Sequence, residues 1–132
     1  MRICETFLAS SLVLLLAGAA RADTILVAPG TYVDTINDLG KPAVIESTDG
    51  AAVTIIDAAG GGSVVTINTT VASGTVLRGF TITGGTGTLA QSSLTEGGGV
   101  FVNSHARATL SECVITGNTV AGSGGGVMLH DL

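Results

Sequence analysis

Apolar and polar residues alternate over short stretches along most of this chain of 132 residues. This alternation, with many valine, isoleucine and threonine residues, is typical of β-strands that bury one face. After residue 22 no window places apolar residues at i, i+3, i+4 and i+7, so no long helix is expected. The expected strands lie at residues 24–28, 43–46, 53–57, 64–67, 77–84, 100–103, 110–117 and 127–130, with glycine-rich turns between many of them.

Two segments of the chain each recur once further along the sequence. Residues 77–84 (LRGFTITG) align with residues 110–117 (LSECVITG) at an offset of 33, and residues 97–100 (GGGV) recur as residues 124–127 at an offset of 27. Self-similarity at such periods indicates a repeat architecture, and the unequal offsets indicate loops of different length. Residues 86–96 (TGTLAQSSLTE) are polar and irregular, so we expect a loop inserted into one repeat.

A single repeat is too small to fold alone. Ordering roughly 25 residues costs about 25 to 50 kcal/mol of backbone entropy, whereas about six inward side chains return only about 1.5 to 3 kcal/mol each. We therefore expect stacked repeats about 4.8 Å apart, each with two strand-like segments. Arg78, Ser111, Thr81 and Val114 are expected to face outward. The expected interior stack places Leu77 on Leu110, Phe80 on Cys113 and Ile82 on Ile115.

The first 22 residues have the features of a secretory signal peptide. Arg2 supplies a positive start, residues 7–18 form an apolar run, and residues 20–22 (ARA) form a small-x-small cleavage site. The apolar run is shorter than the roughly 20 residues that a membrane-spanning helix needs. Cleavage after Ala22 is therefore expected, which predicts a secreted or cell-envelope protein with residues 23–132 as its folded domain.

Charge and cysteine content narrow the possible partners. Removal of residues 1–22 would change the net charge from −5 to −6 and leave only three Lys and Arg residues. Nucleic acid is an unexpected partner for such a chain, because binding to the phosphate backbone requires clustered positive charge. Cys113 would be the one cysteine left, so we expect no disulfide within this segment.

The repeats resemble those of the right-handed parallel β-helix proteins of the pectate-lyase-like superfamily. Residues 25–32 (ILVAPGTY), 41–45 (KPAVI) and 53–57 (VTIID) are similar to the first coils of such domains. The resemblance covers nearly all of residues 23–132 and implies an all-β, right-handed parallel β-helix of about four coils. It implies no single activity, because the superfamily includes lyases, hydrolases, esterases, epimerases, adhesins and surface proteins.

The last strand-like segment begins a new coil and the sequence ends within it. A solenoid requires a polar cap at its end, and this unfinished coil does not supply one. We therefore expect the C-terminal end to be uncapped and the sequence to be the N-terminal part of a longer protein. The alternative is that the last strand is itself a short cap.

Lyases of this superfamily hold Ca²⁺ on clustered carboxylates and use an arginine or lysine as the base. Glu46, Asp49 and Asp57 lie in neighbouring early repeats, but no pair recurs at the repeat offset, as stacked Ca²⁺ ligands would. We therefore expect no metal site and no cofactor. By resemblance Arg78 is the best-placed base, but Ser111 stands at its matching position in the next repeat, so we expect an outward surface arginine.

Other residues that could take part in catalysis or ligand binding are scattered along the sequence. Cys113 takes the place of Phe80 in the stack and is expected to be a small buried hydrophobe. The glycine runs lack the Lys-Ser/Thr of a phosphate-binding loop. His130 and Asp131 are adjacent, and adjacent residues of a strand face opposite sides, so we expect no acid–base pair. The remaining candidates, each expected to be a surface or turn residue, are Glu96, His105 and Glu112.

These observations favour an exported solenoid whose long surface binds polysaccharide or a cell-surface component, with no catalytic residue identified in this segment. The alternative is the N-terminal part of a polysaccharide-degrading lyase or glycoside hydrolase whose active site lies beyond residue 132. Whether the protein is an enzyme stays open at this point.

Overall fold

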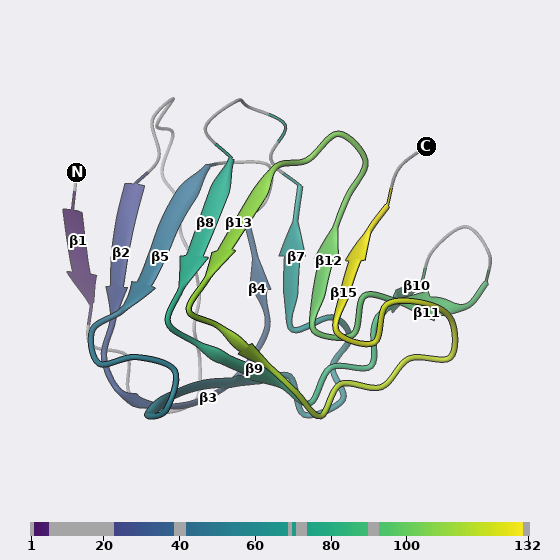
Figure 1. Cartoon of the computed structure of the whole chain (residues 1–132), viewed down its shortest axis with the longest axis horizontal. Coiled ribbons are helices and arrows are strands. Elements are labelled where there is room, and N and C mark those ends of the chain that lie inside the picture. The colour runs from purple at the N-terminus through teal and green to yellow at the C-terminus, as the bar shows by residue number, and fades with distance from the viewer. Residues whose placement is uncertain are drawn as a thin grey trace.

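The chain contributes strands to three parallel sheets in a fixed order. The structure, a computed structural model, describes residues 2–5, 23–38, 42–68, 70, 74–89 and 93–130, with only the backbone for residues 2–5 and 23. In Figure 1 the strands of the first sheet run down, those of the second cross below, and those of the third run back up. The described residues contain no helix, and the architecture is all-β with mostly parallel strands.

The three sheets are named here by the order in which the chain enters them. Sheet A contains β1 (Arg2–Glu5), β2 (Asp23–Val27), β5 (Ala43–Ser47), β8 (Thr75–Arg78) and β13 (Ala108–Ser111). Sheet B contains β3 (Gly30–Val33), β6 (Thr54–Asp57), β9 (Thr81–Thr83) and β14 (Val114–Ile115). Sheet C contains β4 (Ile36–Asn37), β7 (Val65–Ile67), β12 (Val100–Val102) and β15 (Val127–Leu129).

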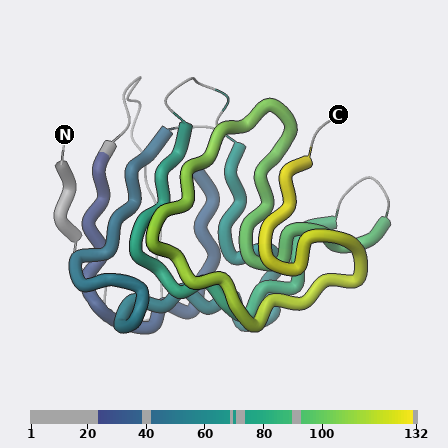
Figure 2. The backbone as a smooth tube through the Cα atoms, in the orientation of Figure 1, coloured from purple at the N-terminus to yellow at the C-terminus, as the bar shows by residue number. Residues whose placement is uncertain are grey.

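We call one strand from each sheet, taken in chain order, a layer. The layer of β8, β9 and β12 lies next to the layer of β13, β14 and β15 in all three sheets. The tube in Figure 2 shows this stacking as the chain advances from one end of the molecule to the other. The strand register joins Leu77 to Leu110 and Val100 to Val127, the same offsets that the sequence repeats have.

Each repeat contains three strands, and the expectation of two is corrected here. The segment that starts at Leu77 is divided between sheets A and B, because the chain turns a corner at Gly79, whose φ is +80°. Glu112 occupies the same corner in the next layer with a φ of +52°. A left-handed backbone conformation ends one strand and redirects the next, and alternation alone does not reveal such a corner.

The interior is built from ladders of like side chains. In sheet A, Ile25, Ile45 and Leu77 pair in register, and in sheet B, Tyr32, Ile56 and Ile82 do the same. All six side chains are buried, and Phe80 at the corner is fully buried among them. Parallel stacking therefore satisfies the backbone hydrogen bonds and buries the apolar face in one arrangement. In sheet C, Ile36, Val65 and Val100 form a buried ladder, and Val127 continues it in the last layer, where its side chain is exposed.

Glycine permits the closest approach between layers. The amides of Gly98 and Gly99 donate to the carbonyls of Gly124 and Gly125, at 3.1 and 3.0 Å. A Cβ on Gly85 would overlap the carbonyl oxygen of Gly98, so a side chain at this position requires the backbone to move. The glycine-rich runs thus have a packing role in this structure.

The loop expected at residues 86–96 contains a short antiparallel pair. β10 (Thr88–Leu89) pairs with β11 (Thr95–Glu96), and residues 90–92 between them lie outside the described part. Figure 1 shows this hairpin projecting to the side of the three sheets. The insertion lies between β9 of sheet B and β12 of sheet C, so it lengthens one layer without breaking the stack.

The N-terminal residues add an edge strand. β1 pairs with β2 in parallel, whereas residues 6–22, which include most of the predicted signal peptide, lie outside the described residues. Cleavage after Ala22 stays a prediction. In the described part of the chain, no helix is long and apolar enough to cross a membrane.

Candidate functional site

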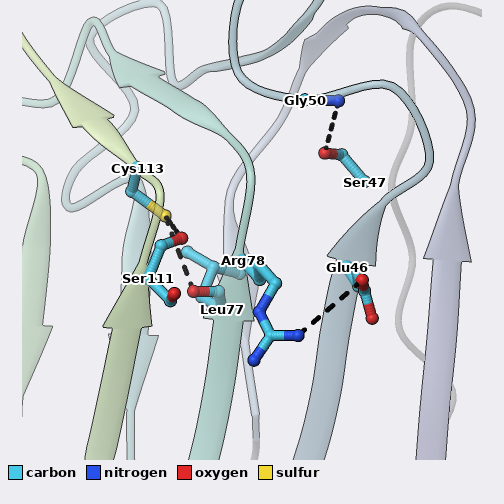
Figure 3. A network of polar contacts seen from close by, with 7 residues as sticks. All are labelled: Glu46, Ser47, Gly50, Leu77, Arg78, Ser111 and Cys113. Carbon is cyan, nitrogen blue, oxygen red and sulfur yellow. Dashed lines mark hydrogen bonds and ion pairs between the residues drawn. The ribbon is translucent and has the colours of Figure 1, made fainter.

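An ion pair lies on the outer face of sheet A. Nη1 of Arg78 is 3.9 Å from Oε1 of Glu46, and the two side chains are 47% and 32% exposed (Figure 3). Both residues occupy outward positions of neighbouring strands, where the register places them directly opposite. An exposed pair of this length contributes about 0 to 1 kcal/mol. Arg78 is therefore held loosely by a carboxylate.

Sequence comparison did not reveal this pairing. The repeat matches Arg78 with Ser111 in the following layer, and the structure shows the same register. The carboxylate of Glu46 comes from the preceding layer, where residues 43–46 (AVIE) precede residues 75–78 (TVLR) by 32 positions. This offset differs from the 33 positions between Arg78 and Ser111, because the loops in the two layers differ in length. Aligning those two strand segments would have revealed it.

The other candidate carboxylates are spread over the molecule. Asp49 is exposed in a turn, and Oδ1 of Asp57 accepts a hydrogen bond of 2.8 Å from the amide of Ala59. Glu96 lies in β11 with its Oε2 buried and without a hydrogen-bond partner, and Glu112 is exposed at its corner. Among the described residues, no three His, Cys, Asp or Glu side chains are grouped so that they could hold a metal ion.

The six residues of the expected stack have two different environments. Leu77, Phe80 and Ile82 are fully buried. Their counterparts in the following layer are partly buried and pack against the core: Leu110, Cys113 and Ile115. Sγ of Cys113 lies 3.3 Å from the carbonyl oxygen of Ser111 and 3.5 Å from that of Leu77, as Figure 3 shows. The thiol is free and faces carbonyl groups of the stack.

A ladder of asparagine side chains lies on sheet C and was not predicted from the sequence. Nδ2 of Asn68 donates to Oδ1 of Asn37 at 2.9 Å, and Nδ2 of Asn103 donates to Oδ1 of Asn68 at 3.1 Å. The three amides come from successive layers and lie in an exposed region at the ends of the strands. Their spacings of 31 and 35 differ from the offsets of the recognisable repeats, which is why the ladder is hard to find in the sequence.

A buried carboxylate, Asp38, was also missed. Its side chain is 1% exposed, and it accepts hydrogen bonds from the amide of Asn68 at 2.7 Å and from the hydroxyl of Thr75 at 2.9 Å. Both contacts reach across layers, since Asp38 follows β4 whereas Thr75 begins β8. Buried charge is costly unless it is well hydrogen-bonded, so these contacts indicate a structural role.

Tyr32 places a phenol in the interior. Its side chain is 1% exposed, and its hydroxyl donates to the carbonyl oxygen of Ala28 at 2.6 Å. Burial raises the pKa of the Tyr32 phenol above its usual value, because the charged phenolate is poorly solvated there. The group is well placed to stabilise the fold and poorly placed to reach a substrate.

The two histidines lie near the ends of the sheet C strands. His105 is exposed in a turn with a φ of +63°, and the His130 ring is 5.8 Å from the Phe101 ring, tilted by 31°. Asp131, the neighbour considered as an acid–base partner, lies outside the described residues. The expectation that His130 and Asp131 face opposite sides therefore stays a prediction.

No protein-family model, curated protein or solved structure matches the chain. The arrangement of the sheets is compatible with a parallel β-helix. The structure brings together Arg78 with Glu46, three asparagine amides in a row, and the buried stack. It also places His105 and His130 around one hollow, and it leaves the other described candidate carboxylates ungrouped.

Proposed function

We propose that this chain is an exported, right-handed parallel β-helix of about four coils that binds polysaccharide along the outer face of sheet C. Three features support the fold: the cyclic order of the sheets, the in-register parallel pairing, and the resemblance of the repeats to the pectate-lyase-like superfamily. The apolar run at residues 7–18 and the small-x-small site before Asp23 support export.

The asparagine ladder is the observation that carries the binding proposal. Asn68 and Asn103 each use one N–H of the side-chain amide within the ladder, and each amide group has two such donors. The hydrogen bonds between the amides fix their orientation before any ligand arrives. A row of oriented, uncharged donors and acceptors from three layers suits the repeated hydroxyl groups of a polysaccharide.

The scattered carboxylates support binding over bond cleavage within the described residues. General acid–base catalysis on a glycosidic bond normally uses two carboxyl groups that face the same bond. Asp49, Asp57, Glu96 and Glu112 lie in different turns and strands, and Glu46 pairs with Arg78.

Co-sedimentation of the full chain with a panel of insoluble polysaccharides tests this proposal. We expect saturable binding to at least one of them, with substantially weaker binding by Asn68→Ala and Asn103→Ala. Thr31→Ala is the matched control, because Thr31 is exposed on the outer face of sheet B and should leave binding unchanged. Circular dichroism of each variant would separate loss of binding from loss of fold.

Two results would overturn the proposal. One is the absence of binding to every polysaccharide while the chain is folded. The other is release of new unsaturated or reducing ends by the purified full chain, which would identify a polysaccharide-degrading enzyme.

A further inference from the structure

Both histidines of the sequence and one arginine line a single hollow. The hollow has a volume of about 440 Å³ and lies where the turn after β12 meets the end of β15. No carboxylate belongs to its described lining. Its lining residues are Thr70, His105, Ala106, Arg107, Leu129 and His130.

This lining contrasts with the charge of the chain. The sequence has ten Asp and Glu residues against five Lys and Arg. Arg78 is paired with Glu46, whereas Arg107 is exposed and forms no ion pair with any residue that the structure describes. An unpaired guanidinium beside two imidazoles therefore forms a local site that favours negative charge.

Two contacts hold His130 in place at the edge of the hollow. Its Nδ1 lies 3.2 Å from the hydroxyl of Ser104, and its ring lies against Phe101. Among the residues that the structure describes, no hydrogen-bond partner is found for the other ring nitrogen, Nε2. The turn that carries His105 is fixed as well, because Ala106 donates from its amide to the carbonyl of Asn103 at 2.9 Å.

We infer that this hollow binds an oxyanion through Arg107, His105 and His130. The guanidinium offers paired N–H donors, the imidazoles offer further N–H donors, and Thr70 adds a hydroxyl. A carboxylate on an acidic sugar and free phosphate have this chemistry in common. The inference is independent of the proposed asparagine surface, which takes uncharged hydroxyl groups.

The chain supplies its own reporters for a test. Because the sequence has two histidines, both in the hollow, two sets of imidazole resonances in the proton NMR spectrum report on the site. The untagged full chain is titrated with sodium glucuronate, glucose and inorganic phosphate at constant pH and ionic strength. We expect both imidazoles to shift saturably with an oxyanion and neither to shift with glucose.

Variants identify the groups that bind. Because charge-assisted hydrogen bonds are the strong ones, Arg107→Gln should weaken oxyanion binding about tenfold or more. Arg78→Gln removes the same charge on sheet A and should leave the affinity unchanged. His130→Gln leaves one imidazole and should weaken binding while the His105 signal still reports it.

The outcomes discriminate clearly. If glucuronate shifts the imidazole signals as phosphate does, the hollow accepts a carboxylate that is carried on a sugar. If phosphate alone shifts them, the site is assigned to free phosphate. Absence of a saturable shift, or equal losses in Arg107→Gln and Arg78→Gln, would overturn the inference. Failure of polysaccharide co-sedimentation would not move these signals, so the two proposals fail separately.

Discussion

The segments 77–83 and 110–116 are near copies in sequence and differ in environment. Leu77, Phe80 and Ile82 are fully buried, because layers pack against them on both sides. Leu110 and Ile115 are partly buried, because β13 and β14 are the last strands of their sheets among the described residues. The same pattern therefore yields a core in one layer and a half-exposed surface in the next.

This difference shows where the stability of the repeat comes from. In a stacked architecture the stability is approximately a sum of terms within each layer and terms between neighbours. A layer with two neighbours receives two interface terms, and β13 and β14 receive one.

The largest effect is expected in the buried layer. Phe80→Ala should lower the free energy of unfolding by about 3 to 5 kcal/mol, because it removes a fully buried ring and leaves a cavity. Cys113→Ala, at the matching position, should cost about 1 kcal/mol or less, since a smaller and half-exposed group is lost. Urea unfolding followed by circular dichroism measures both, and equal losses would contradict the comparison.

A buried polar contact between layers should come next. Asp38→Ala leaves the Asn68 amide and the Thr75 hydroxyl without this partner and should cost about 1.5 to 3 kcal/mol. Asp49→Ala is the matched control, because an exposed turn carboxylate should change stability by less than about 0.5 kcal/mol. If both variants unfold at the same urea concentration, Asp38 has no bridging role.

The sequence reveals the layers more readily than the corners and the contacts between them. The repeat at Leu77 and Leu110 predicts the register, because like apolar side chains recur at one offset. The corner at Glu112 was not predicted, because a glutamate rarely adopts positive φ and only its match to Gly79 indicates one. The Glu46–Arg78 pair and the Asn68–Asn103 contact depend on loop lengths that differ between layers, so no single offset reveals them.

A pH-dependent effect of intermediate size is expected at Tyr32. Because burial raises the pKa of the phenol, folding favours its neutral form, and this stability is present below about pH 10 and lost as pH rises through the folded pKa. Tyr32→Phe should cost about 1 kcal/mol at neutral pH for the lost hydrogen bond and should flatten the alkaline decline. Since the sequence has one tyrosine, phenolate absorbance reports this group directly. Ionisation at the usual pKa in the folded chain would refute the burial.

The smallest effect is expected on the surface. Arg78→Gln and Glu46→Gln should each change the free energy of unfolding by about 0 to 1 kcal/mol, and the effect should fade at high salt. Thermal unfolding of each single variant and of the double variant gives the coupling between the two side chains. A coupling well above about 1 kcal/mol would show that this pair is more than a surface contact.

Hydrogen exchange tests the central comparison most directly. The amide of Ala58 donates to the carbonyl of Thr83, and the amide of Thr116 donates to that of Ile82, so both bond to β9 from opposite sides. The opening free energy at Ala58 should approach that of global unfolding, whereas the value at Thr116 should be clearly lower, because its layer has one described neighbour. Equal protection at the two amides, or greater protection at Thr116, would contradict this account.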